Sequence, residues 1–277
     1  MADLPAFTLL NTRPAHQAAG LQALAQAAGG AALPCPTLKV AFQGVAAEKL
    51  AQLAEFDTLI FISANAVQGL QTALQRAERV WQPGARQTCF AIGRATLKAA
   101  ETLRWKLHSA DAHRFDSEAL LAHPDLQRLQ GKKVLLIKGQ NGRELIAETL
   151  QQRGAEVEAW EVYQRVPCEL CAETWQNFRQ SRHPLVLASS VAGLQALLSA
   201  LSMAENGAKQ TQQAGSAWLL QQPLVTFSAR IADWAEAQGW QGDIQVVDTQ
   251  SDAGIIACIQ QHWPQWFAAE TSKRKQS

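Results

Sequence analysis

The sequence predicts an α/β fold in which two similar domains each contain a parallel sheet. Short apolar runs alternate with segments of helical period along the whole chain, which is the pattern of successive βα units. Four successive units also recur at a nearly constant spacing. The length of 277 residues fits two domains, since one domain usually has about 100–200 residues.

Seven short apolar runs are predicted to be strands. An almost continuous apolar run is typical of a strand that is covered on both faces, as in a parallel sheet with helices on each side. In chain order the runs are Phe7 to Leu10, Thr58 to Ile62, Thr88 to Ile92, Val134 to Ile137, Leu185 to Ala188, Leu224 to Phe227 and Ile244 to Val247.

Helices are predicted after most of these runs, because apolar residues recur there every three or four positions and mark one face. Two of them should end at Gly29-Gly30 and at Gly154, where glycine is favoured as a C-terminal cap. The residues that mark the faces are Leu21, Leu24, Ala25 and Ala28; Val67, Leu70 and Leu74; Leu145, Ile146, Thr149 and Leu150; and Val191, Leu194, Leu198 and Leu201.

The two halves of the chain match each other unit by unit. Ser63 in "LIFISANAVQGL" aligns with Ser189 in "LVLASSVAGLQAL", 126 positions later. The stretch "TLLNTRP" likewise resembles "VLLIKGQ". Two further pairs align at offsets of 135 and 134, namely Gly93 with Ser228 and Ser117-Glu118 with Ser251-Asp252. Such a duplication predicts two similar domains with a cleft between them.

The charge and hydropathy exclude two classes of partner. With 25 Lys and Arg against 24 Asp and Glu, the net charge of +1 creates no field that would attract nucleic acid. No apolar run approaches the ~18 residues of a membrane span, and the first residues include no basic signal-peptide region. We therefore expect a cytoplasmic protein with no nucleic acid and no membrane as partner.

Cysteine and histidine usage gives no support for a disulfide framework or a metal site. The five cysteines are an odd number in a long chain, so reduced thiols are expected. Cys168 and Cys171 form a C-x-x-C, a spacing used by redox pairs and by half of a zinc site, but no second pair exists and coincidence is the preferred interpretation. The six histidines are dispersed without ligand spacing.

Polar side chains follow the predicted strands at their carboxyl ends. In open parallel sheets ligands bind at this edge, where helix N-termini present unpaired N–H groups. Ser63 and Asn65 follow one strand and either bind a ligand or only cap the next helix. Recurrence in both halves favours a shared ligand, since small polar residues also follow other strands at Thr12-Arg13, Gly93 to Thr96, Lys138 to Gly142, Ser189-Ser190 and Ser228.

The familiar nucleotide and hydrolase motifs are absent from the sequence. The stretch "GQNGRE" is neither G-x-G-x-x-G nor a P-loop, so no nucleotide cofactor is expected. There is no G-x-S-x-G elbow either, and Ser63 has no neighbouring histidine that would act as a base.

Tyr163 is the only tyrosine and lies near a predicted passage between the domains. A phenol has a pKa of about 10 and can donate a proton or a hydrogen bond at neutral pH. From the composition alone, a tyrosine packed in an extended linker is the preferred interpretation.

Six motifs together resemble the uroporphyrinogen-III synthase family. They are "NTRP" at 11–14, "FISANAV" at 61–67, "AIGRAT" at 91–96, "LLIKGQNGRELIAETLQQRGAEVEAWEVYQR" at 135–165, "SARIADWAEAQGW" at 228–240 and "QSDAGIIACI" at 250–259. Their order and spacing cover most of the chain, although no single motif is decisive.

The resemblance implies two α/β domains that are joined by a two-stranded linker, with the active site in the cleft between them. Domain 1 would be discontinuous and would comprise residues 1–36 and 167–262, and domain 2 would comprise residues 38–165. Residues 263–277 would form a flexible basic tail.

The resemblance also implies a lyase reaction on the linear tetrapyrrole hydroxymethylbilane. The hydroxymethyl group loses water, the azafulvene so formed is attacked by the terminal ring at its substituted carbon, and that ring is inverted on closure. The unassisted reaction closes the substrate without inversion, so the enzyme mainly holds one folded geometry. No cofactor and no metal are required, and a monomer is expected, while a transient contact with the upstream deaminase is left open.

By motif, Tyr163 would be the catalytic residue that assists loss of the hydroxyl group, either as a donor or as a positioning group. Ile231 stands where Thr96 stands in the other half, which puts a side-chain contact there in doubt. The substrate would be bound through its eight carboxylates by Arg13, Ser63, Asn65, Gly93, Thr96, Lys138, Gly139, Ser189, Ser190, Ser228 and Arg230.

Two other interpretations share the duplicated architecture. A two-domain small-molecule binding protein without catalysis would have the same central cleft, but the periplasmic type would carry a signal peptide. A flavodoxin-like regulatory module should place acidic residues at a strand end, where this sequence has serine, glycine and lysine.

Overall fold

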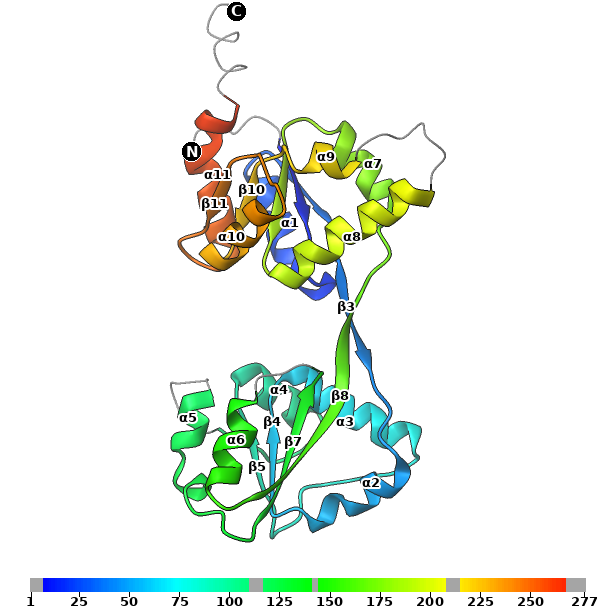
Figure 1. The fold of residues 1–277 in the computed structure, drawn as a ribbon, viewed down its shortest axis with the longest axis vertical. Helices are drawn as coiled ribbons and strands as arrows, with labels where there is room; N and C mark the ends of the chain where they lie inside the picture. The colour runs from blue at the N-terminus through cyan, green and yellow to red at the C-terminus, as the bar shows by residue number, and fades with distance from the viewer. Residues whose placement is uncertain (1–6, 110–116, 141–143, 208–214, 268–277) are drawn as a thin grey trace, which may run out of the picture. The chain divides into compact units, whose positions relative to one another are not determined.

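The computed structural model describes residues 7–109, 117–140, 144–207 and 215–267. Contacts divide the chain into two compact units. Unit 1 contains Met1–Lys39 and Pro167–Ser277, and unit 2 contains Val40–Val166. Each unit is built around its own sheet (Figure 1).

Unit 1 has a five-stranded sheet in the order β11-β10-β9-β1-β2, and every pair of neighbours is parallel. The strands are β1 (Thr8–Asn11), β2 (Ala31–Pro34), β9 (Pro184–Ala188), β10 (Leu224–Thr226) and β11 (Ile244–Val246). Its helices are α1 (Ala18–Ala27), α7 (Ala172–Gln180), α8 (Val191–Gly207), α9 (Gly215–Leu219), α10 (Ala229–Ala237) and α11 (Asp252–Trp266), with a 3-10 turn at Ala15–Gln17.

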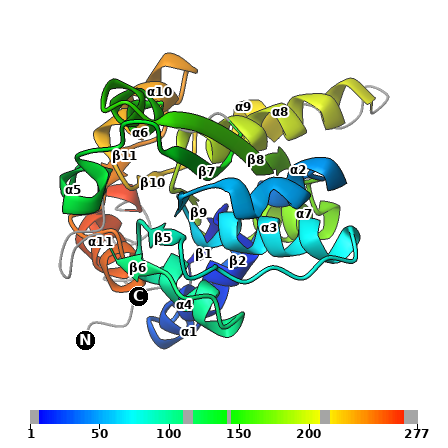
Figure 2. The ribbon, with the colours of Figure 1, turned by 90° about the horizontal axis from the view of Figure 1, so that it is seen from below.

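Unit 2 has a six-stranded sheet in the order β3-β8-β7-β4-β5-β6, with parallel pairing from β8 to β6. Strands β7 and β8 lie side by side in it (Figure 2). The strands are β3 (Leu38–Phe42), β4 (Thr58–Phe61), β5 (Thr88–Ala91), β6 (His108–Ser109), β7 (Lys133–Gly139) and β8 (Glu156–Pro167). The helices are α2 (Ala47–Ala51), α3 (Ala64–Arg76), α4 (Arg94–Thr102), α5 (Ser117–Ala122) and α6 (Leu145–Gln152), with 3-10 turns at Gln52–Glu55 and Pro124–Leu126.

The strand order and register reproduce the duplication that the sequence predicted. The order β8-β7-β4-β5-β6 in unit 2 corresponds to β2-β1-β9-β10-β11 in unit 1. Thr8 pairs with Ala31 in unit 1, and the residues 126 positions later, Val134 and Val157, pair in unit 2. Because a shift of one residue would turn every side chain to the other face, equal registers mean equivalent faces. The predicted α/β class with two parallel sheets is confirmed.

Alternating side chains of each strand fill two separate apolar layers. In β4, Leu59 and Phe61 join the cluster that contains Val67 and Leu70 of α3. The intervening Ile60 joins the cluster beneath α5 and α6 on the other face. Period-2 alternation between two covered faces explains why the strand is apolar throughout.

The predicted helix faces need two corrections. Leu24 and Leu145 are exposed, although both were expected on buried faces. Successive residues are turned by about 100° on a helix, so Leu145 points away from the stripe that Ile146 and Leu150 bury. The predicted glycine caps are confirmed for α1 and α6, because Gly29 and Gly154 have φ of 79° and 88°.

Helix α11 extends past residue 262, where a flexible tail was expected to begin. The helix reaches Trp266, and Trp263 is buried because its ring packs against Phe7, with centroids 6.1 Å apart. Residues 268–277 of the expected tail lie outside the described residues.

Helix α3 packs on β8 at a glycine. A Cβ at Gly69 would lie 2.8 Å from the backbone oxygen of Val162, which itself accepts a hydrogen bond from Gln43 N at 2.9 Å. Gly69→Ala is therefore expected to lower the free energy of unfolding by about 1–3 kcal/mol, as overpacking does. Urea denaturation followed by circular dichroism measures this change, and an unchanged midpoint would contradict the described packing.

Candidate functional site

Two residues that are distant in sequence meet at the carboxyl end of the unit 2 sheet. Ser63 follows β4 as the N-cap of α3, and Tyr163 lies in β8. The Ser63 Oγ and the Tyr163 Oη are 3.0 Å apart, and the tyrosine is buried. Ser63 Oγ also accepts a hydrogen bond from Ala66 N at 3.2 Å. The serine therefore caps the helix and contacts the phenol at once.

Gly139 makes room for the tyrosine ring. It is the last residue of β7 and pairs with Tyr163 across an irregularity in the register between Lys138 and Gly139. A Cβ at position 139 would lie 2.5 Å from Cζ and 2.9 Å from Oη of the tyrosine. Just beyond, Gln140 N donates to Tyr163 O at 2.9 Å, which holds the two backbones together. Any side chain at position 139 would displace the phenol.

Other predicted residues of unit 2 lie at neighbouring strand ends. Asn65 is half-buried in the first turn of α3, and Gly93 is the N-cap of α4. Thr96 lies in the first turn of α4 and is buried. Lys138 Nζ is 3.8 Å from Glu161 Oε1, which partly neutralises its charge. The residues described at this edge thus include the N-termini of α3 and α4 and the cation of Lys138, whose charge Glu161 partly compensates.

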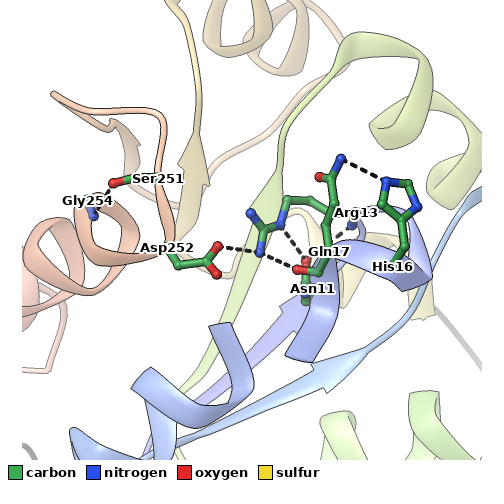
Figure 3. Close-up of polar contacts among 7 residues, drawn as sticks. All are labelled: Asn11, Arg13, His16, Gln17, Ser251, Asp252 and Gly254. Atoms are coloured by element: carbon green, nitrogen blue, oxygen red, sulfur yellow. Dashed lines mark hydrogen bonds and ion pairs between the residues drawn. The ribbon is translucent and has the colours of Figure 1, made fainter. Parts of the chain in front are cut away.

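In unit 1, Arg13 is buried at the carboxyl end of β1 (Figure 3). Its Nη2 donates to Asp252 Oδ1 at 2.8 Å and to Gln17 O at 2.8 Å. Its Nε and its backbone N both donate to Asn11 Oδ1, at 3.3 and 3.2 Å. Arg13 was expected to pair with a substrate carboxylate, and much of its donor capacity is already used within the protein.

Asn11 has an amide nitrogen without a partner. Its Nδ2 is one of two enclosed side-chain polar atoms that lack a hydrogen bond among the described residues, the other being Trp81 Nε1. The amide cannot simply be turned round, because its oxygen accepts from two Arg13 donors. An enclosed, unpaired donor costs about 1–3 kcal/mol, so this arrangement needs an explanation.

The remaining predicted residues of unit 1 lie beside α8 and α10. Ser190 Oγ accepts from Gly193 N at 3.1 Å, so Ser190 caps α8. Ser228 is the N-cap of α10, but its side chain makes no capping hydrogen bond. Ser189 is half-buried and Arg230 is exposed. Of the two possibilities for such serines, capping and ligand binding, the structure shows capping for Ser190 and leaves the Ser228 hydroxyl without a capping hydrogen bond.

Sequence reasoning did not assign Asp252 to the site. The pairing of Ser117-Glu118 with Ser251-Asp252 was a signal, because it placed an acidic residue directly after a serine in both halves. Ser251 Oγ caps α11 by accepting from Gly254 N at 3.0 Å. The cap is therefore complete without Asp252, whose carboxylate is directed to Arg13.

The thiols of Cys168 and Cys171 are free, as are those of the other cysteines. Hydrogen bonds from the side chain and then the backbone of Thr174 lower the pKa of the exposed Cys171 thiol at the N-terminus of α7. Burial, followed by the charges of Cys171 and Cys168, raises the pKa of Cys35 to about 12.

Within the described residues, no group of three His, Cys, Asp or Glu side chains is placed to hold a metal.

Iodoacetamide at about pH 8 is therefore expected to alkylate Cys171 well before Cys35, because only the thiolate reacts. Peptide mass mapping over a time course measures the order. Equal rates for the two residues in folded protein would contradict it.

The described helices contain none that is both long and apolar enough to cross a membrane.

A family model described as uroporphyrinogen-III synthase HemD matches residues 19–255. The uroporphyrinogen-III synthase of Escherichia coli K12 is 35% identical over 215 residues, covering 77% of this chain and 82% of that protein. The uroporphyrinogen-III synthase of Salmonella typhimurium LT2 is 33% identical over 259 residues, covering 92% of this chain and 100% of that protein.

Solved structures with the same fold come from more distant relatives. The uroporphyrinogen-III synthetase of Helicobacter pylori 26695 has a TM-score of 0.56 at 12% identity, covering 93% of this chain and 99% of that one. A mutant uroporphyrinogen III synthase of the extremely thermophilic bacterium Thermus thermophilus has a TM-score of 0.52 at 14% identity, covering 94% and 99%. With the family model spanning most of the sequence, the chain belongs to the uroporphyrinogen-III synthase family.

Proposed function

We propose that this chain cyclises hydroxymethylbilane to uroporphyrinogen III in tetrapyrrole biosynthesis, as a lyase that removes water and inverts the terminal ring. Family membership over residues 19–255 carries the proposal. Monomeric action, a transient contact with the upstream deaminase and a cytoplasmic location remain predictions.

Tyr163 is proposed to assist departure of the hydroxyl group from the substrate. Hydroxide is a poor leaving group, and a donor that protonates or hydrogen-bonds the departing oxygen lowers the barrier. The phenol is buried and accepts or donates one hydrogen bond with Ser63 at 3.0 Å. Departure leaves the azafulvene cation, which the substituted carbon of the terminal ring attacks to give a spiro intermediate before ring inversion.

Ser63 is proposed to direct the phenolic proton. Its Oγ already accepts from Ala66 N, so its own O–H is available to donate to Tyr163 Oη. In that arrangement the tyrosine proton points away from Ser63 and towards a ligand. A chain of donors from Ala66 N–H through Ser63 to Tyr163 also strengthens each bond, because hydrogen bonds in series polarise one another.

Ser63→Ala is expected to lower kcat about 3- to 10-fold, the effect of losing one neutral hydrogen bond of about 1 kcal/mol. Loss of the cap on α3 should also lower the free energy of unfolding by about 1 kcal/mol. Ser63→Thr retains the hydroxyl and should restore most of the kcat. Equal kcat for wild type and Ser63→Ala would exclude the directing role.

Carboxylates of the substrate are proposed to bind to groups at the strand ends. Each exposed helix N-terminus favours an anion by about 0.3–1 kcal/mol, so several contacts are needed for a substrate with eight carboxylates. In this proposal Ser63 acts on the substrate through Tyr163, because its single O–H donates to the phenol. The groups that bind carboxylates are Asn65, Gly93, Thr96, Lys138, Gly139, Ser189, Ser190, Ser228 and Arg230, together with Arg13.

The test is a coupled assay in which porphobilinogen and a deaminase generate hydroxymethylbilane and the oxidised products are separated by chromatography. When the protein is added, we expect the type III isomer to be the dominant product. Type I isomer alone, in the presence of folded protein, would refute the proposal and favour a small-molecule binding protein without catalysis.

A further inference from the structure

Two donor groups at the carboxyl end of β1 have no acceptor among the residues that the structure describes. Nη1 of Arg13 makes no hydrogen bond within the described part of the chain, whereas its Nε and Nη2 are both engaged. Nη1 is not among the enclosed unpaired atoms, so it has access to solvent. Nδ2 of Asn11 is enclosed and unpaired. Both donors belong to one connected cluster (Figure 3).

The guanidinium of Arg13 is held by three acceptors. Asp252 Oδ1 and Gln17 O hold Nη2 at 2.8 Å each, and Asn11 Oδ1 faces Nε. A guanidinium is planar, so these contacts fix the direction of the remaining edge as well. The edge that carries Nη1 is therefore presented in one orientation.

Asp252 is itself held in place. It is the first residue of α11, and its other oxygen, Oδ2, lies against Gly20 of α1, where a Cβ would overlap it. The side chain is 29% exposed, compared with 6% for Arg13. Since Ser251 already caps α11, the Asp252 carboxylate is not needed as a cap and can hold Arg13.

We propose that Arg13 binds a carboxylate of the substrate through Nη1, and that Asp252 is the positioning residue that aims this edge. The proposal rests on the proposed function, whose substrate supplies carboxylates, the acceptors that this cluster lacks. The ion pair is nearly neutral, so orientation of the donor, more than net charge, creates the affinity. An octacarboxylate can satisfy Nη1 without breaking any contact that the cluster already has.

The test is a double-mutant cycle on the steady-state kinetics of type III isomer formation. Arg13→Gln is expected to raise KM about 10-fold with kcat within about 2-fold, since a charged hydrogen bond made before the reaction contributes uniformly to binding. Asp252→Asn should raise KM about 3-fold by releasing the guanidinium. In the Arg13→Gln background, Asp252→Asn should have no further effect on KM.

Controls separate binding from folding and from the proposed function itself. Asp233→Asn removes a carboxylate from α10 of the same unit and should leave KM unchanged. If Arg13→Gln does not fold, Arg13→Lys replaces it, because lysine keeps the charge but cannot present a fixed edge. Folded Arg13 variants with the wild-type KM would overturn the proposal, as would a full effect of Asp252→Asn in the double variant. Failure of the proposed function is distinct, since wild type would then form no type III isomer.

Discussion

Tyr163→Phe is expected to lower kcat about 100-fold while changing the free energy of unfolding by only about 1 kcal/mol. General acid–base catalysis usually raises a rate by ~10²–10⁴-fold. We expect the lower end of this range for Tyr163, because holding the substrate in its folded geometry also accelerates the reaction. The stability change is small because phenylalanine fills the same buried space and only the hydrogen bond to Ser63 is lost. Steady-state kinetics and thermal melting measure the two effects.

A loss of less than about 10-fold would indicate that the phenol positions the substrate without transferring a proton. Because Tyr163 is the only tyrosine, labelling with 3-fluorotyrosine gives one fluorine resonance that reports on the phenol directly. That resonance should shift in Ser63→Ala. Unchanged kinetics of Tyr163→Phe with a normal melting curve would remove Tyr163 from the mechanism.

Gly139→Ala is expected to lower kcat nearly as much as Tyr163→Phe. The new Cβ would lie 2.5 Å from Tyr163 Cζ, and the hydrogen bond from Gln140 N to Tyr163 O prevents the strands from separating. The ring must therefore turn away from Ser63. Overpacking should also lower the free energy of unfolding by about 1–3 kcal/mol.

Gly44→Ala is the matched control, because a Cβ at position 44 would meet nothing within 4 Å. The Gly139→Ala, Tyr163→Phe double variant should be no slower than Tyr163→Phe alone, since both changes act on the same phenol. Gly139→Ala with a wild-type kcat would show that the position of the phenol is not important.

The sequence predicts the buried strands well and the others poorly. Strand β4 is apolar throughout because both of its faces are covered, and such a run is visible without a structure. Strand β8 was not predicted as a strand from its residues, because Glu156 and Glu161 interrupt the apolar pattern on its exposed positions. Strand β2 was hidden by its alanines and its terminal proline.

The sequence proposes candidate site residues one by one, but it does not predict how they are arranged. Ser63, Gly139 and Tyr163 were each proposed from the sequence, yet Ser63 and Tyr163 are 100 positions apart, and Gly139 pairs with Tyr163 only after an irregularity in the register between β7 and β8. The ion pair of Arg13 with Asp252 joins residues 239 positions apart. No local pattern encodes such contacts, because the fold alone brings the strand ends together.

The most direct measurement is the ratio of type III to type I isomer formed by wild type and by Tyr163→Phe at equal protein concentration. Spontaneous closure gives type I, so the isomer ratio reports how much faster the catalysed closure is than the spontaneous closure. Almost pure type III is expected for wild type, and a rising share of type I is expected for Tyr163→Phe. Type I alone from folded wild-type protein would contradict it.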